Sequence, residues 1–306
     1  MANPDAVTPT TRPPARLQIL GVVLIVLSTI AIAMVPSLAK IAYQGGSNTL
    51  TVITGRSVVS VFLTLVVVLL MGQPVRIARR PAVIGLVVGA AYGAMLYGYL
   101  GAMNYLPVNL VILIYFVHPL LVGVAGALLG RETLTPLKLA TLVLAIAGLG
   151  LAMGFSLDGI DLRGLALAVF AMFAAAFTIL GNAEAGRDAP PLSVCLYMMA
   201  GAAVVLTIPM FAVGTVAWPV TAAGWSGLIG VAFLATFGTL TFFTGMPLVG
   251  VTRAAMISNL EPILGILLAI AILGEGLTLV QWVGVVMVIG AIVGMEALRT
   301  APGSST

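Results

Sequence analysis

Apolar residues occur along the chain in long stretches, without the strict alternation that a half-buried strand would show. Ten stretches are each about 18–25 residues long, the length that a helix needs to cross roughly 30 Å of hydrocarbon. They cover residues 18–39, 49–71, 82–105, 107–129, 134–154, 163–181, 191–213, 222–246, 252–273 and 278–298. An open sheet cannot pair its backbone in lipid, and no ten-residue alternation typical of a barrel occurs. The pattern predicts an all-α integral membrane protein with ten transmembrane helices.

Composition agrees with lipid as the solvent and excludes an ordinary soluble domain. Of the 306 residues, 61% are hydrophobic and 7% are charged, and the mean hydropathy is +1.21. A soluble domain carries about 25% charged residues, because its surface faces water. The net charge of +4 comes from arginines in loops and implies no nucleic-acid partner. The single cysteine, Cys195, excludes an internal disulfide.

The positively charged residues predict the orientation in the membrane. If the N-terminus is cytoplasmic, ten of the 13 lysines and arginines fall in cytoplasmic segments, and only Lys40, Arg56 and Arg163 fall on the opposite side. This positive-inside bias predicts a multi-pass protein with both termini in the cytoplasm. The first apolar stretch lacks a small-residue cleavage pattern, so we expect it to be retained. The proline-rich residues 1–16 and the end 299–306 are expected to be flexible tails.

The second half of the sequence repeats the first at an offset of 143 residues. His118-Pro119 falls on Glu261-Pro262, and a later Glu-x-Leu-Thr pattern falls on its counterpart without a gap. The repeats cover residues 17–156 and 157–298, with five stretches each. An odd number of crossings makes the two repeats enter the membrane from opposite sides, which is the architecture of many alternating-access transporters. We therefore expect two inverted five-helix repeats; a duplication that serves packing alone is the alternative.

Two ionisable residues lie near the middle of their stretches, at equivalent positions of the two repeats. They are His118 and Glu261, and a charged side chain at mid-membrane costs at least about 2.5–3.5 kcal/mol. Such residues usually mark a substrate or ion pathway. For Glu261 we expect contact with a substrate amine or proton coupling; the alternative is a protonated carboxyl that bridges broken backbone. For His118 we expect a place in the substrate site, with a neutral core imidazole as the alternative.

Each of these residues precedes a proline that breaks its helix. Pro119 deprives the carbonyl of Tyr115 of its helical donor, and Pro262 does the same to Ser258. A free carbonyl beside an ionisable side chain would form a polar pocket suited to an ammonium group. The sequence therefore predicts a substrate site between the repeats, near the midplane.

Aromatic residues of the third and fourth stretches could complete this site. Tyr92 and Tyr99 are seven residues apart and share a helical face, and Tyr115 follows in the next stretch. Phe237, in the eighth stretch, is the expected counterpart from the second repeat. Such rings could stack on an apolar group while the hydroxyls bind polar atoms. Alternatively, the hydroxyls only find partners on neighbouring helices, as buried tyrosines usually do.

Lys40 and Arg56 lie toward the outer ends of the first two stretches. Their long side chains could reach the interface and simply hold their charges in water. They could instead form a gate, or meet a substrate carboxylate.

These motifs resemble the drug/metabolite transporter superfamily, in particular its EamA-type members with ten crossings. Each half of that family has a mid-helix proline, then a Gly-Glu-x-Leu turn, then a final helix. This chain has Pro119 followed by Gly130-Arg131-Glu132-Thr133-Leu134, and Pro262 followed by Gly274-Glu275-Gly276-Leu277. Arg131 departs from the pattern, since it stands between the glycine and the glutamate. Overall similarity is greatest to the YddG-type exporters of aromatic and other amino acids, which implies a bacterial inner-membrane exporter.

Other functional classes fit the sequence less well. A membrane enzyme needs a catalytic constellation, and the chain has one histidine, one cysteine and no nucleophile motif or metal-ligand pair. A channel needs a selectivity filter or a ring of charged side chains, and the sequence has no evident motif for either. We expect no cofactor and no metal, the lipid bilayer and a small-molecule substrate such as an amino acid as partners, and either a monomer or a homodimer. A multidrug exporter and a sugar-phosphate carrier remain alternatives, although the second should have more basic residues than Lys40 and Arg56.

Overall fold

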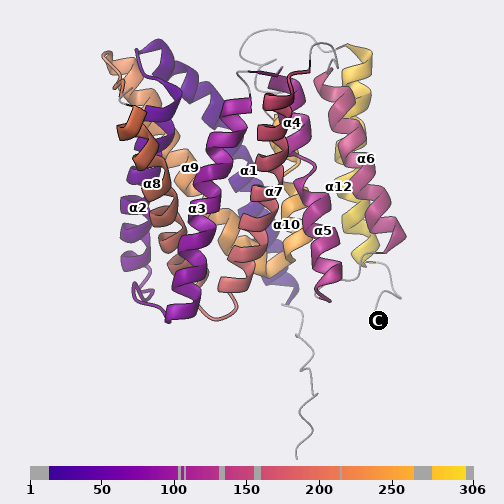
Figure 1. Cartoon of the computed structure of the whole chain (residues 1–306). Coiled ribbons are helices and arrows are strands. Elements are labelled where there is room, and N and C mark those ends of the chain that lie inside the picture. The colour runs from indigo at the N-terminus through magenta and orange to yellow at the C-terminus, as the bar shows by residue number, and fades with distance from the viewer. Residues whose placement is uncertain are drawn as a thin grey trace, which may run out of the picture.

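The computed structural model describes residues 14–102, 105–106, 108–130, 135–154, 160–213, 216–264 and 278–300. Every regular element within these residues is a helix, and the helices lie side by side along one common direction (Figure 1). They are α1 Ala15–Gln44, α2 Thr49–Leu70, α3 Arg79–Ala102, α4 Val108–Tyr115, α5 His118–Leu128, α6 Pro136–Met153, α7 Leu162–Ala185, α8 Pro191–Val213, α9 Ala222–Val249, α10 Val251–Ile257 and α12 Leu279–Thr300.

Seven helical segments of the described chain are long and apolar enough to cross a membrane. They are α1, α2, α3, α7, α8, α9 and the stretch Leu110–Leu128, which contains most of α4 and all of α5. Two shorter apolar segments lie within α6 and α12, at Pro136–Ala152 and Leu279–Ala291. The predicted stretch 252–273 begins within α10 and ends outside the described residues. The protein is thus an all-helical, multi-pass membrane protein.

Polar residues fix where several of these helices begin. Asn48, Thr135, Asp161 and Thr221 precede α2, α6, α7 and α9, and each side chain accepts a hydrogen bond from a backbone N–H of the first turn. These amides have no partner within the helix, so the caps replace bonds that lipid could not supply. The short polar breaks in the sequence therefore define the helix ends.

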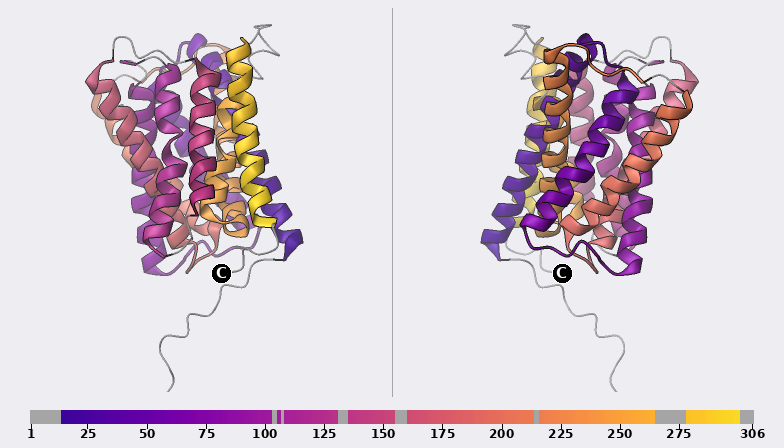
Figure 2. Two further views of the ribbon diagram at one scale, coloured as in Figure 1. Left: turned by 90° about the vertical axis from the view of Figure 1, so that its right-hand side faces the viewer. Right: turned by 90° about the vertical axis from the view of Figure 1, so that its left-hand side faces the viewer.

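The helices of the two halves are interleaved. α3 packs along both α7 and α8, and α9 packs along both α1 and α2. Numbered within the repeats expected from the sequence, the third helix of each repeat lies against the first two helices of the other (Figure 2). α6 and α12, the last helix of each repeat, pack against one another at one edge of the molecule. The two halves therefore form one continuous helical body.

Glycines let the paired helices approach until their backbones touch. A Cβ atom on Gly89 of α3 would overlap the carbonyl of Met198 on α8, and one on Gly201 would overlap the carbonyl of Leu86. Gly148 of α6 and Gly284 of α12 face each other in the same way, so neither position has room for a side chain. Such close packing is the main source of attraction between helices in lipid, where apolar burial gives no advantage.

The last helices of the two halves run in opposite directions. Gly148 of α6 lies beside Gly284 and Met287 of α12, whereas Gly154, at the end of α6, lies near Gln281 at the start of α12. α1 and α9 are also antiparallel, because Gly21 meets Leu248. α1 begins and α12 ends on the same face of the molecule, the lower one in Figure 1.

An ion-pair cluster ties two connections together on this lower face. Arg80, at the start of α3, donates to Glu184 at 2.9 Å and to Asp188 at 2.8 Å, beyond the end of α7. Arg187 lies 3.5 Å from the same glutamate. Since α3 and α7 also pack along their length, these bonds reinforce an existing contact and do not bridge a gap.

Packing between α6 and α12 can be tested with two glycines of one helix. Gly284→Ala should destabilise the protein by about 1–3 kcal/mol, because the added methyl group forces the backbones apart. Gly290→Ala is the matched control, since nothing lies within 4 Å of a Cβ atom there. Thermal unfolding of the detergent-solubilised variants measures both. Equal melting temperatures would contradict the close approach of the two helices.

Candidate functional site

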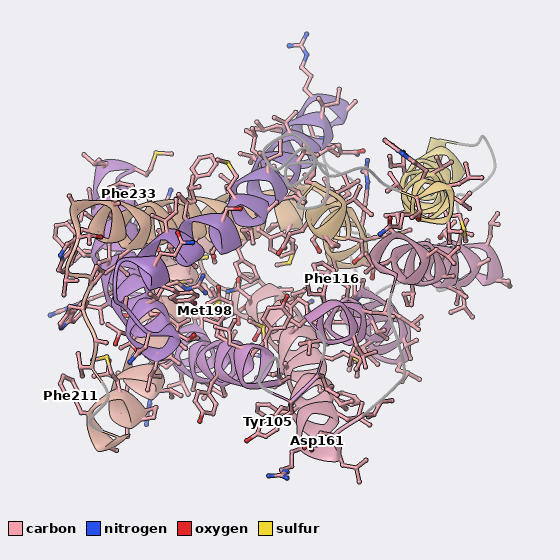
Figure 3. The ribbon with its side chains drawn as sticks, turned by 90° about the horizontal axis from the view of Figure 1, so that it is seen from above. Tyr105, Phe116, Asp161, Met198, Phe211 and Phe233 are labelled. Atoms are coloured by element: carbon pink, nitrogen blue, oxygen red, sulfur yellow. The ribbon has the colours of Figure 1, made fainter. Side chains whose placement is uncertain are left out.

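The described helices enclose a cavity of about 400 Å³. Its walls come from both halves of the chain: α1, α2, α3, α4, α5, α7, α9 and the segment that follows α10. Seen from above, Phe116, which lines the cavity, lies toward the middle of the molecule, whereas Phe211 and Phe233 lie at the rim (Figure 3). The cavity is thus central and shared between the repeats.

The cavity extends toward the face of the molecule opposite the one where α1 begins and α12 ends. On α1 its wall runs from Ser28 to Tyr43, next to the end of the helix, and on α2 it begins at Val52, near the start. On the other side, a cluster of buried apolar side chains fills the interior. It includes Ile25, Val88, Val122, Met198, Met246, Val249 and Ala254. Within the described part of the chain, buried apolar side chains thus close the interior below the cavity.

Two helix breaks lie in the middle of the molecule, at equivalent positions of the two halves. α4 ends at Tyr115 and α5 begins at His118, and α10 ends at Ile257 before the helix resumes at 260. Each break is followed by a proline, Pro119 or Pro262, which has no amide to donate to the preceding turn. The sequence stretch 107–129 is thus two helices with a turn between them.

His118 supplies the donor that Pro119 takes away. Its Nδ1 atom lies 2.9 Å from the carbonyl oxygen of Tyr115, the carbonyl predicted to lose its helical partner. A carbonyl can only accept, so Nδ1 carries the proton in this bond. In the neutral ring Nε2 is then an acceptor, and it forms no hydrogen bond within the described part of the chain. His118 is buried, at 3% exposure, yet lines the cavity.

The second break is repaired differently. The carbonyl of Ser258, also predicted to be free, accepts the backbone N–H of Glu261 at 2.9 Å. The hydroxyl of Ser258 donates to the carbonyl of Ala255. The carboxyl group of Glu261 is therefore not needed to bridge the backbone. Glu261 is half-buried, and its side chain lines the cavity with no hydrogen bond to the described residues.

Aromatic rings form one wall of the cavity beside the first break. The rings of Tyr99 and Tyr115 have centroids 4.8 Å apart, and those of Tyr115 and His118 are 5.0 Å apart. The hydroxyl of Tyr115 donates to the sulfur of Met95 at 3.6 Å. Tyr115 thus has an interhelical partner while its ring stays in the cavity wall.

Arg56 reaches into the cavity instead of the outer interface. It lies seven residues after the start of α2, roughly 10 Å along the axis, and is 9% exposed. Its guanidinium donates to the hydroxyl of Tyr92 on α3 at 3.4 Å. Arg56 and Glu261 act on one another electrostatically across the cavity but form no direct ion pair. A cavity with a guanidinium and a carboxyl group can bind a molecule that carries both a carboxylate and an ammonium group.

The structure brings together most of the candidate residues from the sequence, with exceptions on α9 and α1. His118, Glu261, Tyr92, Tyr99, Tyr115 and Arg56 all line the cavity. Phe237 does not: it is 46% exposed on the outer face of α9. The side chain of Lys40 lies outside the described residues.

Phe242 and Phe243 occupy the cavity wall that was assigned to Phe237. The signal that could have found them is the helical spacing from Val231 through Ala235 and Thr239, all on the same face. Because nearly every residue of α9 is apolar, that spacing could not be separated from the face that contacts lipid.

No cluster of three His, Cys, Asp or Glu side chains that could bind a metal occurs in the described ranges.

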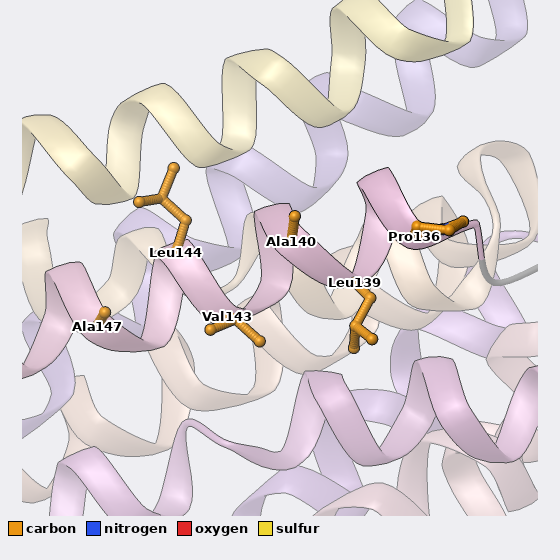
Figure 4. Close-up of a pocket in the computed structure, with 6 residues that line it drawn as sticks. All are labelled: Pro136, Leu139, Ala140, Val143, Leu144 and Ala147. Atoms are coloured by element: carbon orange, nitrogen blue, oxygen red, sulfur yellow. The ribbon is translucent and has the colours of Figure 1, made fainter.

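A second hollow of about 450 Å³ lies on the outer side of α6. Pro136, Leu139, Ala140, Val143, Leu144 and Ala147 line it (Figure 4). None of these side chains carries a polar atom, so this hollow offers no group that could recognise a charged or hydrogen-bonding ligand. The central cavity is the candidate site.

Comparison with known protein families identifies the family of this chain. Residues 19–154 and 162–296 each match the EamA-like transporter family. The chain belongs to the EamA-like transporter family. The two matches begin 143 residues apart, the same offset as the repeat in the sequence. Members of this family are transporters, so the central cavity lies in a transport protein.

A solved structure agrees at the level of the fold. A protein known from a crystal structure superposes with a TM-score of 0.77, covering 92% of this chain and 99% of its own, at 17% identity. At this identity the likeness concerns the arrangement of helices only. Comparison with curated proteins finds no match.

The bond between His118 and the broken helix can be tested by exchanging the ring for an amide. His118→Asn should keep the stability, because its side-chain amide can donate from near the position of Nδ1. His118→Gln places its amide further out and should cost about 1–3 kcal/mol, the cost of a buried acceptor left unpaired. Thermal unfolding in detergent compares the two variants. Greater stability of the glutamine variant would contradict the assignment of Nδ1 as the donor.

Proposed function

We propose that this EamA-like transporter exports amino acids and related small metabolites by alternating access around the central cavity. The observation that carries the proposal is the chemistry of the cavity, where Arg56 and Glu261 offer opposite charges beside an aromatic wall. An arginine can bind a carboxylate with two hydrogen bonds, and a carboxylate can bind an ammonium group. The volume, about 400 Å³, is in the range of small-molecule sites.

Two features support alternating access by ten crossings in two inverted repeats. α6 and α12 stand at the same place in the two family matches and run in opposite directions, as inverted repeats require. The helix breaks at the two prolines lie at equivalent positions, beside the cavity. A polar break at mid-membrane is typical of transporter sites.

The distribution of charge supports export across a bacterial inner membrane. Arg76 and Arg187 lie in connections, and Arg79 and Arg80 in the first turn of α3, on the same side as the start of α1 and the end of α12. The positive-inside rule then favours a cytoplasmic location for this side. The packed cluster around Met198 and Met246 then lies between the cavity and the cytoplasmic side.

Counterflow in proteoliposomes tests the proposal. Liposomes loaded with an unlabelled amino acid should accumulate the same labelled amino acid above the level of protein-free liposomes, since a carrier exchanges substrate across the bilayer. The common amino acids are assayed one by one, each against protein-free liposomes. Absence of exchange with every common amino acid would contradict amino-acid transport.

Export of amphiphilic drugs is a second candidate, favoured by the apolar part of the wall. Ile32, Val35, Met95, Leu96 and Leu100 line the cavity beside the polar groups. The same liposomes decide between the two: a drug exporter would exchange lipophilic cations and would be indifferent to zwitterions.

A further inference from the structure

Among the described residues that line the cavity, one arginine, Arg56, and one acidic residue, Glu261, can form a pair of opposite charge. The other described lining residues are apolar, hydroxyl-bearing or aromatic, and His118 is hydrogen-bonded through Nδ1. Arg56 comes from the first family match and Glu261 from the second. Each half of the molecule thus contributes one charge to a shared space.

Neither group has an oppositely charged partner in hydrogen-bond contact within the described part of the chain. The partner of Arg56 is a neutral phenol, the hydroxyl of Tyr92, at 3.4 Å. The carboxyl group of Glu261 has no hydrogen-bond donor among the described residues, and the two groups interact only at a distance. Tyr115 lies within the electrostatic reach of both. Arg56 and Glu261 therefore line the same cavity without a direct bond between them.

Closing this space changes the energy of each charge. An open cavity lets water solvate the guanidinium and the carboxylate, but an occluded cavity at mid-membrane does not. A buried charge without a partner is strongly unfavourable, whereas a well-paired couple is tolerated. An occluded state should therefore contain equal numbers of positive and negative groups.

We propose that the cavity closes only when it is empty, with Arg56 paired to Glu261, or when it holds a zwitterion whose carboxylate meets Arg56 and whose ammonium meets Glu261. The inference rests on the proposed function and names its substrate class: molecules with one positive and one negative group and an uncharged remainder. A singly charged amine or acid binds in the open cavity but is not carried, because closing around it leaves one charge unpaired.

The proposal predicts that removing one charge exchanges the substrate class. In Glu261→Gln the arginine is alone, so a closed cavity is neutral with a bound carboxylate and charged with a bound zwitterion. In Arg56→Gln the glutamate is alone, so a closed cavity is neutral with a bound amine. Each variant should lose transport of amino acids and gain transport of one kind of ion.

Three probes with the same carbon skeleton test this rule: leucine, its decarboxylated amine 3-methylbutylamine, and its deaminated acid 4-methylpentanoate. Exchange of each labelled probe into liposomes loaded with the same unlabelled probe is measured, after subtraction of the flux into protein-free liposomes; exchange is used because a variant with one charge cannot close around an empty cavity. Wild type should carry leucine about tenfold faster than either ion, which corresponds to roughly 1.4 kcal/mol. Glu261→Gln should prefer the acid and Arg56→Gln the amine, each by a similar factor.

Matched control variants distinguish the effect of removing a charge from the cavity from the effect of removing one from the surface. Glu184→Gln and Arg80→Gln make the same chemical changes in the exposed ion-pair cluster and should keep the preference of wild type. Arg56→Lys and Glu261→Asp keep the charges and should keep the preference for leucine. Thermal unfolding checks that each variant is folded; if the glutamine variants do not fold, the preference of wild type and of the charge-conserving variants decides.

Two results would overturn the proposal. One is a wild-type protein that carries the amine or the acid as fast as leucine; the other is a folded, active glutamine variant of the cavity that still prefers leucine. In both cases amino-acid transport itself stands. A wild-type protein that carries the ions but exchanges none of the amino acids would instead refute the proposed function.

Discussion

Inside hydrocarbon, every polar group of the chain needs a partner within the protein, and this requirement organises the whole structure. It is met along the helices by their own backbone and fails where a proline withholds an amide, as Pro119 and Pro262 do at the two helix breaks beside the cavity. The first failure is repaired by the ring of His118, and the second by the backbone of Glu261 through a tighter turn. Both repairs put an ionisable residue at the centre of the molecule. The polar cavity is thus a consequence of where the helices break.

The sequence was sufficient for the helical class and for the ionisable and several of the aromatic residues that line the cavity, because both depend on local signals. Length and apolarity predict membrane helices, and a charged residue beside a proline at mid-helix stands out against an apolar background. His118, Glu261 and Arg56 could be named for this reason. The tyrosines were found because a spacing of seven residues marks one helical face.

What the sequence could not supply was the direction in which apolar residues face. Phe237 and Phe242 are five residues apart on a helix that is apolar on all sides, so hydropathy gives no preference for one face over the other. The tertiary contacts of α9 with α1 and α2 decide it, and these contacts join segments far apart in the chain. The position of the Arg56 side chain also depends on a tertiary contact. Tyr92, which belongs to another helix, accepts a hydrogen bond from Arg56 and keeps the arginine side chain inside the cavity.

The interleaving of helices has a consequence for the synthesis of the protein. α1 ends at Gln44, but α9, along which it packs, begins only at Ala222. The ribosome must therefore make most of the chain before the glycine-bearing side of α1 meets its partner. Until then α1 stays in the membrane with that side covered by lipid or by the insertion machinery. Proper assembly depends on how long the earliest helix can wait without pairing elsewhere.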